Sequence, residues 1–344
     1  QRELPGKVAL TVGFSGSRSD HMSVTGTSNS GRVNINQLPL NELSRGSALL
    51  ERVPNPFFGI PEFGELSQSS EIDRAQLLLP YPEFQEVRAV RKSDGIGRFS
   101  ALTIKAERRM DSLGLSFLAS YSWSKMLDNY FGEANQFINR TTLPLDNFNL
   151  ANEYSYSIFD VPHRWIFAPI WDLPLGRGKR WASSGFAEKV FGGWNITPII
   201  QIQSGFPTSV WQTDRVAGGY GGQQRPNRVA EVSPCTSGSP QERIGNWFNG
   251  SAFLPAGTFT LGNAPRRLGD CRGPGLANMD LSVRKAVNLT ERTRVSFRVE
   301  ALNATNTPRF SAPNTEFGNL LQFGRITGTE GFARIIQWML RFEF

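Results

Sequence analysis

Apolar and polar residues alternate with a period of two along several stretches of this chain. The clearest stretch is 113–123, which reads Leu-Gly-Leu-Ser-Phe-Leu-Ala-Ser-Tyr-Ser-Trp. Successive side chains of a β-strand point to opposite sides of the sheet, so every second residue shares a face. One face of this stretch is apolar from Leu113 to Trp123, and the other is mostly glycine and serine. The pattern therefore predicts a strand with one apolar face.

Seven further stretches show the same alternation, and together they predict an all-β fold of eight antiparallel strands. The predicted strands are 5–18, 96–109, 113–126, 161–172, 191–205, 276–287, 292–304 and 332–344. In 161–172, around Trp165, Phe167 and Trp171, the pattern leaves open which face points outward. A soluble β-sandwich that buries one face is the alternative, because it produces the same alternation.

The connections between the predicted strands alternate between long and short. The long connections are 19–95, 127–160, 206–275 and 305–331, and the short ones are 110–112, 173–190 and 288–291. Outer-membrane barrels have long outer loops and short periplasmic turns. We therefore expect an antiparallel transmembrane β-barrel, or the C-terminal portion of one, in contact with the lipid of the bacterial outer membrane.

Composition narrows the class further. The 34 glycines and 21 prolines disfavour an all-helical protein, because both residues interrupt helices. No apolar run approaches the ~18 residues that a membrane-spanning helix needs. The net charge is +7, and the arginines are scattered along the chain, so we expect no nucleic-acid partner.

The sequence offers little chemistry for catalysis. Its only histidines, His21 and His163, are far apart, and no Gly-x-Ser-x-Gly or His-Glu-x-x-His motif occurs. We expect no enzyme, no cofactor and no metal site. Cys235 and Cys271 lie in stretches rich in glycine, proline and serine. In an oxidising compartment they would form a disulfide that closes an exposed loop, and two free thiols are the alternative.

The longest well-marked connection, 206–275, is rich in aromatic residues that are candidates for ligand contact. These candidates are Trp211, Tyr220, Trp247, Phe248 and Phe253. Exposed aromatic rings can stack on a sugar or hold a hydrophobic ligand. The alternative is that they pack the loop against itself.

Several short motifs, in order along nearly the whole chain, resemble one family of membrane proteins. They are Leu173–Arg180 (LPLGRGKR), Gly192–Trp194, Gln203–Pro207, Trp247–Asn249, Ala252–Phe253, Arg272–Gly275, Asn278–Ser282, Phe297–Asn303, Phe323–Thr327 and Arg341–Phe344. They resemble the C-terminal barrel of TonB-dependent outer-membrane receptors, in particular the Oar-like branch with a carboxypeptidase-regulatory-like N-terminal domain.

The resemblance implies a 22-stranded barrel that is closed by an N-terminal plug and energised through TonB. No plug, Ton box or regulatory domain is recognisable here, so we expect residues 1–344 to be one C-terminal barrel segment for uptake of an unidentified ligand. A self-contained small barrel that acts as an adhesin or anchor is the alternative. The alternate apolar residues Trp338, Leu340, Phe342 and Phe344 resemble the terminal signal read by the barrel-assembly machinery.

Overall fold

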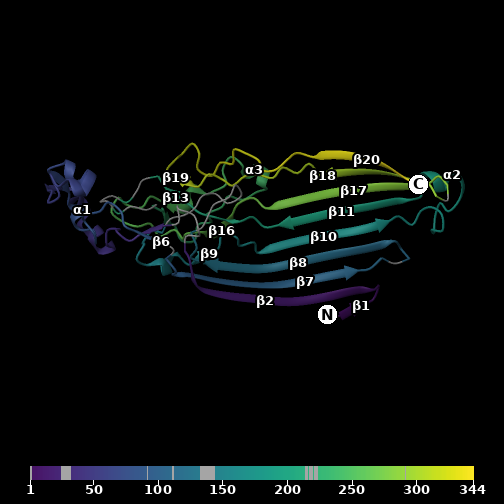
Figure 1. Cartoon of the computed structure of the whole chain (residues 1–344), viewed down its shortest axis with the longest axis horizontal. Helices are drawn as coiled ribbons and strands as arrows, with labels where there is room; N and C mark the ends of the chain where they lie inside the picture. Colours follow the sequence, from purple (N-terminus) through teal and green to yellow (C-terminus); the bar gives the residue numbers. More distant parts are fainter. Residues whose placement is uncertain are drawn as a thin grey trace.

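A single antiparallel sheet of long strands dominates the computed structural model (Figure 1). The structure describes residues 2–24, 32–90, 92–110, 112–131, 144–213, 216, 220, 224–290 and 292–344. The long strands are β2 (Val8–Met22), β7 (Gly95–Arg108), β8 (Leu115–Asp128), β10 (His163–Asp172), β11 (Trp194–Gln203), β17 (Leu276–Asn288), β18 (Arg294–Leu302) and β20 (Ile335–Glu343). All eight predicted strands are thus confirmed, with ends that differ by a few residues.

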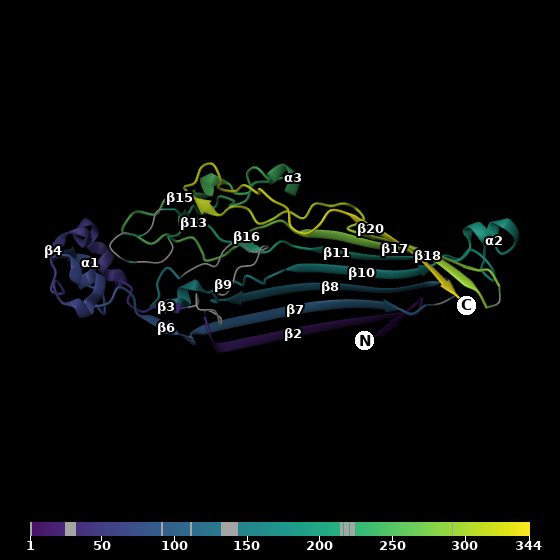
Figure 2. The same cartoon turned by 45° about the horizontal axis from the view of Figure 1, so that its top comes forward.

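Each long strand pairs with the next long strand along the chain. The sheet order is β1-β2-β7-β8-β10-β11-β17-β18-β20, where β1 (Arg2–Leu4) is a short edge strand and β9 (Ser155–Tyr156) pairs with the far end of β8. The two edges, β1 and β20, do not pair with each other, so the sheet is open. Figures 1 and 2 show β2 and β20 on opposite sides of the sheet.

The pairing registers place the apolar sides of all eight strands on one surface, which we call the apolar face. Directly opposite residues of an antiparallel pair point to the same side. One row of opposite residues runs Val12, Ile104, Tyr121, Trp165, Ile202 and Ala277. A second row runs Ile196, Val283, Val299 and Trp338. The register therefore settles which side of β10 belongs to this face, because Trp165, Phe167 and Trp171 stand opposite apolar-face residues of both neighbours.

The other surface, the polar face, carries side chains that bond to one another. Arg298 donates to Ser282 Oγ at 3.0 Å and pairs with Glu300 at 2.7 Å. Farther along the sheet, Asn195 Nδ2 donates to Asp172 Oδ1 at 2.7 Å. A few apolar residues, such as Ile170 and Ile199, interrupt this face, but its overall character is polar. No second sheet packs on the apolar face within the described residues, so the chain does not adopt the β-sandwich.

The long connections all leave the same end of the sheet, the loop end, and the short ones leave the opposite turn end (Figure 1). We call the long connections 23–94, 129–162, 204–275 and 303–334 together the loop domain. It contains five small strand pairs: β3 (Arg32–Asn34) with β6 (Arg88–Val90), β4 (Arg52–Pro54) with β5 (Glu71–Asp73), β12 (Pro207–Thr208) with β16 (Leu268–Arg272), β13 (Trp211–Gln212) with β19 (Glu316–Phe317), and β14 (Asn227–Arg228) with β15 (Phe253–Leu254).

The helices are short. They are the 3-10 helices η1 (Leu40–Leu50), η2 (Pro61–Gln68), η3 (Leu150–Glu153) and η4 (Gly250–Ala252), and the α-helices α1 (Arg74–Leu77), α2 (Gly185–Phe191) and α3 (Pro240–Arg243). Across the described ranges, none of them has the length and apolar character that a membrane-crossing helix requires. Helix α2 occupies the end of the predicted turn 173–190 and the first residue of the predicted strand 191–205, where the sequence had indicated no helix.

The buried core is in the loop domain and not in the sheet. Apart from Ala101 and Pro169, the buried apolar side chains of the described residues belong to the loop domain. They form three clusters, of which the largest two centre on Leu38 and on Trp247. On β7 near the loop end, the polar-face residues Gly97 and Ala101 are buried, whereas Ile96 and Arg98 on the apolar face are exposed. The loop domain therefore covers the polar face there and leaves the apolar face open.

Candidate functional site

The loop domain is the natural candidate for a binding site, because rigid strands present it at one end of the molecule. Three of the five predicted aromatic residues lie in one of its buried clusters. Phe248 stacks on Phe323 with ring centroids 5.1 Å apart, and Phe253 lies edge-on to Phe323 at 6.0 Å. The indole Nε1 of Trp247 donates to the carbonyl oxygen of Arg272 at 2.8 Å.

The other two aromatic candidates are placed differently. Tyr220 is buried in the cluster around Leu38, and its hydroxyl has no hydrogen-bond partner among the described residues. Burial, followed by the negative charges of Asp146 and Glu153, raises the pKa of Tyr220 above its ordinary value. Trp211 is half-buried in β13, where it stands opposite Glu316.

The rings of Tyr220, Trp247, Phe248 and Phe253 are buried and not exposed as expected, and ligand contact by the five aromatic candidates stays a prediction. Their large apolar area is removed from water inside the loop domain, which stabilises it. The alternative, that the aromatics pack the loop against itself, describes these four residues. Only Trp211 keeps part of its surface accessible.

Cys235 and Cys271 form a disulfide with their Cα atoms 5.2 Å apart. The bridge is not in an exposed loop as expected, because Cys271 is completely buried in the Trp247 cluster. It ties the segment before α3 to β16. The guanidinium of Arg243 donates to Cys235 Sγ at 2.9 Å and lies over the Trp247 ring.

Arginine–carboxylate pairs hold the connection 204–275 in place, and the sequence did not reveal them. Arg266 is fully buried, and its Nη2 donates to Asp128 Oδ1 at 2.7 Å, at the loop end of β8. The same guanidinium donates to the carbonyl oxygens of Tyr130 at 2.6 Å and Glu153 at 2.9 Å. A charged group that is buried with partners at every side is strongly constrained in position. Arg266 therefore fixes the connection 204–275 against the end of β8.

Two further pairs join the connection 204–275 to the connection 129–162. Arg225 pairs with Glu153, and both side chains are buried. Arg272 pairs with Asp160, and its Nη1 also donates to the Asp160 carbonyl oxygen at 3.0 Å. The only hint in the sequence is that Asp128 and Asp160 flank predicted strands; nothing in their spacing identifies the arginine partners.

Arg267 is the exception among these arginines. The residue is 2% exposed, yet its Nε and Nη1 atoms have no hydrogen-bond partner within the described part of the chain. Loss of water around the guanidinium, together with the positive charges of Arg266 and Arg225, lowers the pKa of Arg267 to about 9. Asp128 opposes this shift. A buried cation in this situation costs free energy of folding.

Comparison with known proteins identifies the class of the molecule. A family model for the outer membrane beta barrel domain matches residues 1–337. The chain belongs to this family. The match covers the long strands from β2 to β18 and the first residues of β20, and it places the chain in the bacterial outer membrane. No curated protein matches the chain.

In an outer membrane beta barrel domain the apolar face is the surface that contacts lipid. The predicted assembly residues of β20 lie on it at the edge of the sheet. Trp338 is 74% exposed, Leu340 and Phe342 are also exposed, and Phe344, just beyond the strand, is fully exposed. The β20 edge has no strand partner on its outer side among the described residues. A role of these residues in assembly stays a prediction.

The turn end of the barrel domain carries exposed aromatic and basic residues beside each other. Trp181 is exposed, and the Arg180 guanidinium lies 5.2 Å from its ring centre. Helix α2 adds the exposed residues Phe186 and Phe191. Aromatic and basic side chains of this kind are typical of a membrane–water interface.

Neither histidine belongs to a recognisable catalytic group. The Nδ1 atom of His163 lies 2.8 Å from the hydroxyl of Tyr121, on the apolar face. Within the described ranges, no three His, Cys, Asp or Glu side chains gather closely enough to hold a metal ion.

Proposed function

We propose that this outer membrane beta barrel domain is the C-terminal barrel segment of a TonB-dependent, Oar-like receptor that takes up an unidentified ligand. In this proposal the polar face lines the lumen and contacts a plug that lies outside residues 1–344. The loop end faces the exterior and meets the ligand first. The role is one of transport, without catalysis or nucleic-acid binding.

The open sheet is the observation that carries this proposal. An eight-stranded barrel closes by pairing its first strand with its last. Here β1 and β20 lie at opposite edges and do not pair, while the neighbouring strands keep regular registers throughout. A lipid-exposed strand edge has unpaired backbone groups, which a bilayer does not tolerate. Further strands that continue the sheet beyond β1 would remove this problem and enlarge the barrel.

The polar face also supports a lumen. Its Arg298–Glu300 pair and its Asn195–Asp172 hydrogen bond need water or a polar partner around them, and both would lie on the inner side of a closed barrel. The loop domain fits an outer position because it has its own buried core and a disulfide, which forms in an oxidising compartment.

The orientation of the barrel follows from its connections. Outer-membrane barrels have short periplasmic turns and long external loops. The loop end would then lie outside the cell, and the turn end, with β20 finishing there, in the periplasm. The barrel-assembly machinery would read the exposed apolar residues of β20 from that side.

The test is to purify the mature protein from the outer membrane of its native host and to measure its intact mass. We expect a mass well above the 38.3 kDa of residues 1–344, because a plug and further strands precede residue 1. We also expect the purified protein to bind the periplasmic domain of TonB in a pull-down. A mature protein of 38.3 kDa that does not bind TonB would contradict the proposal.

The second candidate is a self-contained small barrel that acts as an adhesin or anchor. The compact, disulfide-bonded loop domain favours it, since a rigid external domain suits attachment. It predicts the 38.3 kDa mass and a pairing of β1 or β2 with β20. Disulfide cross-linking of cysteines placed in β2 and β20 would detect that pairing.

A further inference from the structure

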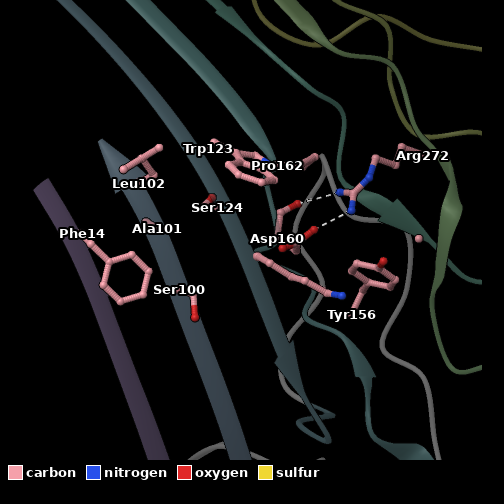
Figure 3. A pocket seen from close by; sticks show the side chains of 12 residues that line it. Phe14, Ser100, Ala101, Leu102, Trp123, Ser124, Tyr156, Asp160, Pro162 and Arg272 are labelled. Carbon is pink, nitrogen blue, oxygen red and sulfur yellow. Dashed lines mark hydrogen bonds and ion pairs between the residues drawn. The ribbon is translucent and has the colours of Figure 1, made fainter. Parts of the chain in front are cut away.

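A groove runs across the apolar face at the loop end of β2, β7 and β8, and Figure 3 shows its part between Phe14 and Arg272. It consists of two adjoining hollows of about 630 and 500 Å³, which share Phe14 and Ser100. Leu102, Trp123 and Tyr156 line the first hollow, and Arg18 and Arg98 line the second. We call the two hollows together the loop-end groove.

The strand registers arrange the side chains of the groove in rows, from the loop end toward the centre of the sheet. The row nearest the tips contains Arg18 opposite Arg98. The next row toward the centre contains Ser100 opposite Lys125. These basic and hydroxyl side chains thus form the upper wall of the groove, on the same side of the sheet as the apolar residues below them.

The lower wall is apolar and aromatic. Phe14, Leu102 and Trp123 stand opposite one another in the row beneath Lys125, and Phe14 is 74% exposed. The row below that one begins with Val12 and Ile104, which belong to the continuous apolar face. The groove therefore continues into the apolar face that contacts lipid, because its apolar row lies directly beside the row of Val12 and Ile104.

Two of the cationic side chains that line the groove are available to bind an anion. Arg18 is paired with Asp20 at 3.1 Å, and Arg272 is paired with Asp160. Arg98 and Lys125 have no carboxylate partner within the described part of the chain, and both are exposed. The Lys125 Nζ atom lies 5.4 Å from the centre of the Tyr156 ring, which holds it at the edge of the first hollow.

We propose that the loop-end groove binds the phosphate-bearing headgroup of an outer-leaflet lipid. Arg98 and Lys125 contact the phosphate, the Ser100 hydroxyl donates a hydrogen bond to it, and the acyl chains lie over Phe14, Leu102 and Trp123. The order of the rows favours a lipid over free phosphate as the ligand. The cations lie nearest the loop end, the aromatic residues lie in the next row toward the centre of the sheet, and the lipid-facing surface follows. This inference goes beyond the proposed transport role and rests only on its orientation in the membrane.

The experiment is a titration of the full-length protein in a neutral detergent, with bound lipid detected by native mass spectrometry. The probes are bisphosphorylated lipid A and the same lipid after removal of its phosphates. We expect the phosphorylated probe to bind more tightly than the dephosphorylated one. Each cation near a membrane surface contributes about fivefold in affinity, so Arg98→Gln/Lys125→Gln should weaken binding by about 25-fold.

Three variants serve as controls. Arg164→Gln/Arg284→Gln removes the same charge from the polar face and should bind lipid as the unchanged protein does. Arg98→Lys/Lys125→Arg keeps the charge and should keep the binding. Ser100→Phe fills the junction of the two hollows without changing charge and should weaken binding, which tests the groove even if the double Gln variant fails to fold.

Three results would overturn the proposal. The first is equal binding of the phosphorylated and dephosphorylated probes. The second is binding by Arg98→Gln/Lys125→Gln within twofold of the unchanged protein. The third is displacement of the lipid by inorganic phosphate alone, which would indicate a site for soluble phosphate. None of these results depends on the mass or TonB measurements, so the transport proposal fails or stands separately.

Discussion

The sheet and the loop domain are stabilised in opposite ways. The long strands leave their apolar side chains on an uncovered face, and almost none of them is buried. The loop domain buries its aromatic residues in clusters, joins two segments by a disulfide and encloses arginine–carboxylate pairs. A soluble sheet would bury its apolar face in protein. The difference shows that each region is adapted to its own solvent, lipid for the sheet and water for the loop domain.

The largest expected effect is in the loop domain, at two adjacent arginines. Arg266→Met should destabilise the loop domain by about 3 to 5 kcal/mol, because it leaves Asp128 buried without its cation. Arg267→Met should be neutral or stabilising, because it removes a buried cation whose Nε and Nη1 have no partner among the residues that the structure describes. Resistance of the loop domain to proteolysis in urea measures the stability of both variants. An equal loss of stability in Arg266→Met and Arg267→Met would contradict the expected difference between them.

Removal of the disulfide should have the next largest effect. Replacing Cys235 and Cys271 by serine should destabilise the loop domain by roughly 3 to 4 kcal/mol in the loop-entropy model. The sheet should keep its heat-modifiable migration on a gel, because the bridge lies outside it. Loss of both the protease resistance and the heat-modifiable migration would mean that the two regions are not independently stabilised.

A pair of substitutions at neighbouring positions of β11 tests the sheet. Ile200 lies on the apolar face and Gln201 on the polar face. Ile200→Arg should destabilise the folded barrel by about 2 to 4 kcal/mol, because an arginine on the lipid side is costly near the middle of the bilayer. Gln201→Arg should cost much less. Urea unfolding in lipid vesicles measures both, and a larger cost for Gln201→Arg would reverse the assignment of the faces.

The smallest effect is a pH dependence of Arg267. Burial lowers the pKa of Arg267 to about 9 in the folded state, so the unfolded state holds more protons in the pH window between this value and the ordinary pKa of arginine. Stability therefore rises with pH across this window, and the cost of the buried charge is fully present below about pH 9. The stability difference between Arg267→Met and the unchanged protein should shrink as the pH rises from 8 to 10.5. A stability difference that stays constant or grows over this pH range would contradict the lowered pKa of Arg267.

The strands and their faces were predictable because they depend on local alternation. A period of two along 113–123 needs no knowledge of the partner strand, and the registers then aligned the seven faces that had been assigned independently. The pattern left open which face of β10 points outward, and the registers with its two neighbouring strands assign that face. Helix α2 was missed because seven residues are too few for a clear helical period.

The interior of the loop domain was not predictable, because its contacts join residues that are distant in the sequence. Arg266 and Asp128 are 138 positions apart, and no spacing rule connects them. The same limit explains the aromatic residues of 206–275. Their abundance indicated importance, but whether Trp247 packs or binds depends on Arg272, Phe323 and the disulfide around it.

The central claim is that one continuous face of the sheet contacts lipid. Single cysteines at positions 196–203 of β11 can carry a fluorophore in the folded protein in vesicles, with Cys235 and Cys271 kept as a disulfide. A quencher attached to lipid acyl chains should quench the label at 196, 198, 200 and 202 and spare 197, 199, 201 and 203. Quenching that is equal at all eight positions, or stronger at the odd ones, would contradict the account.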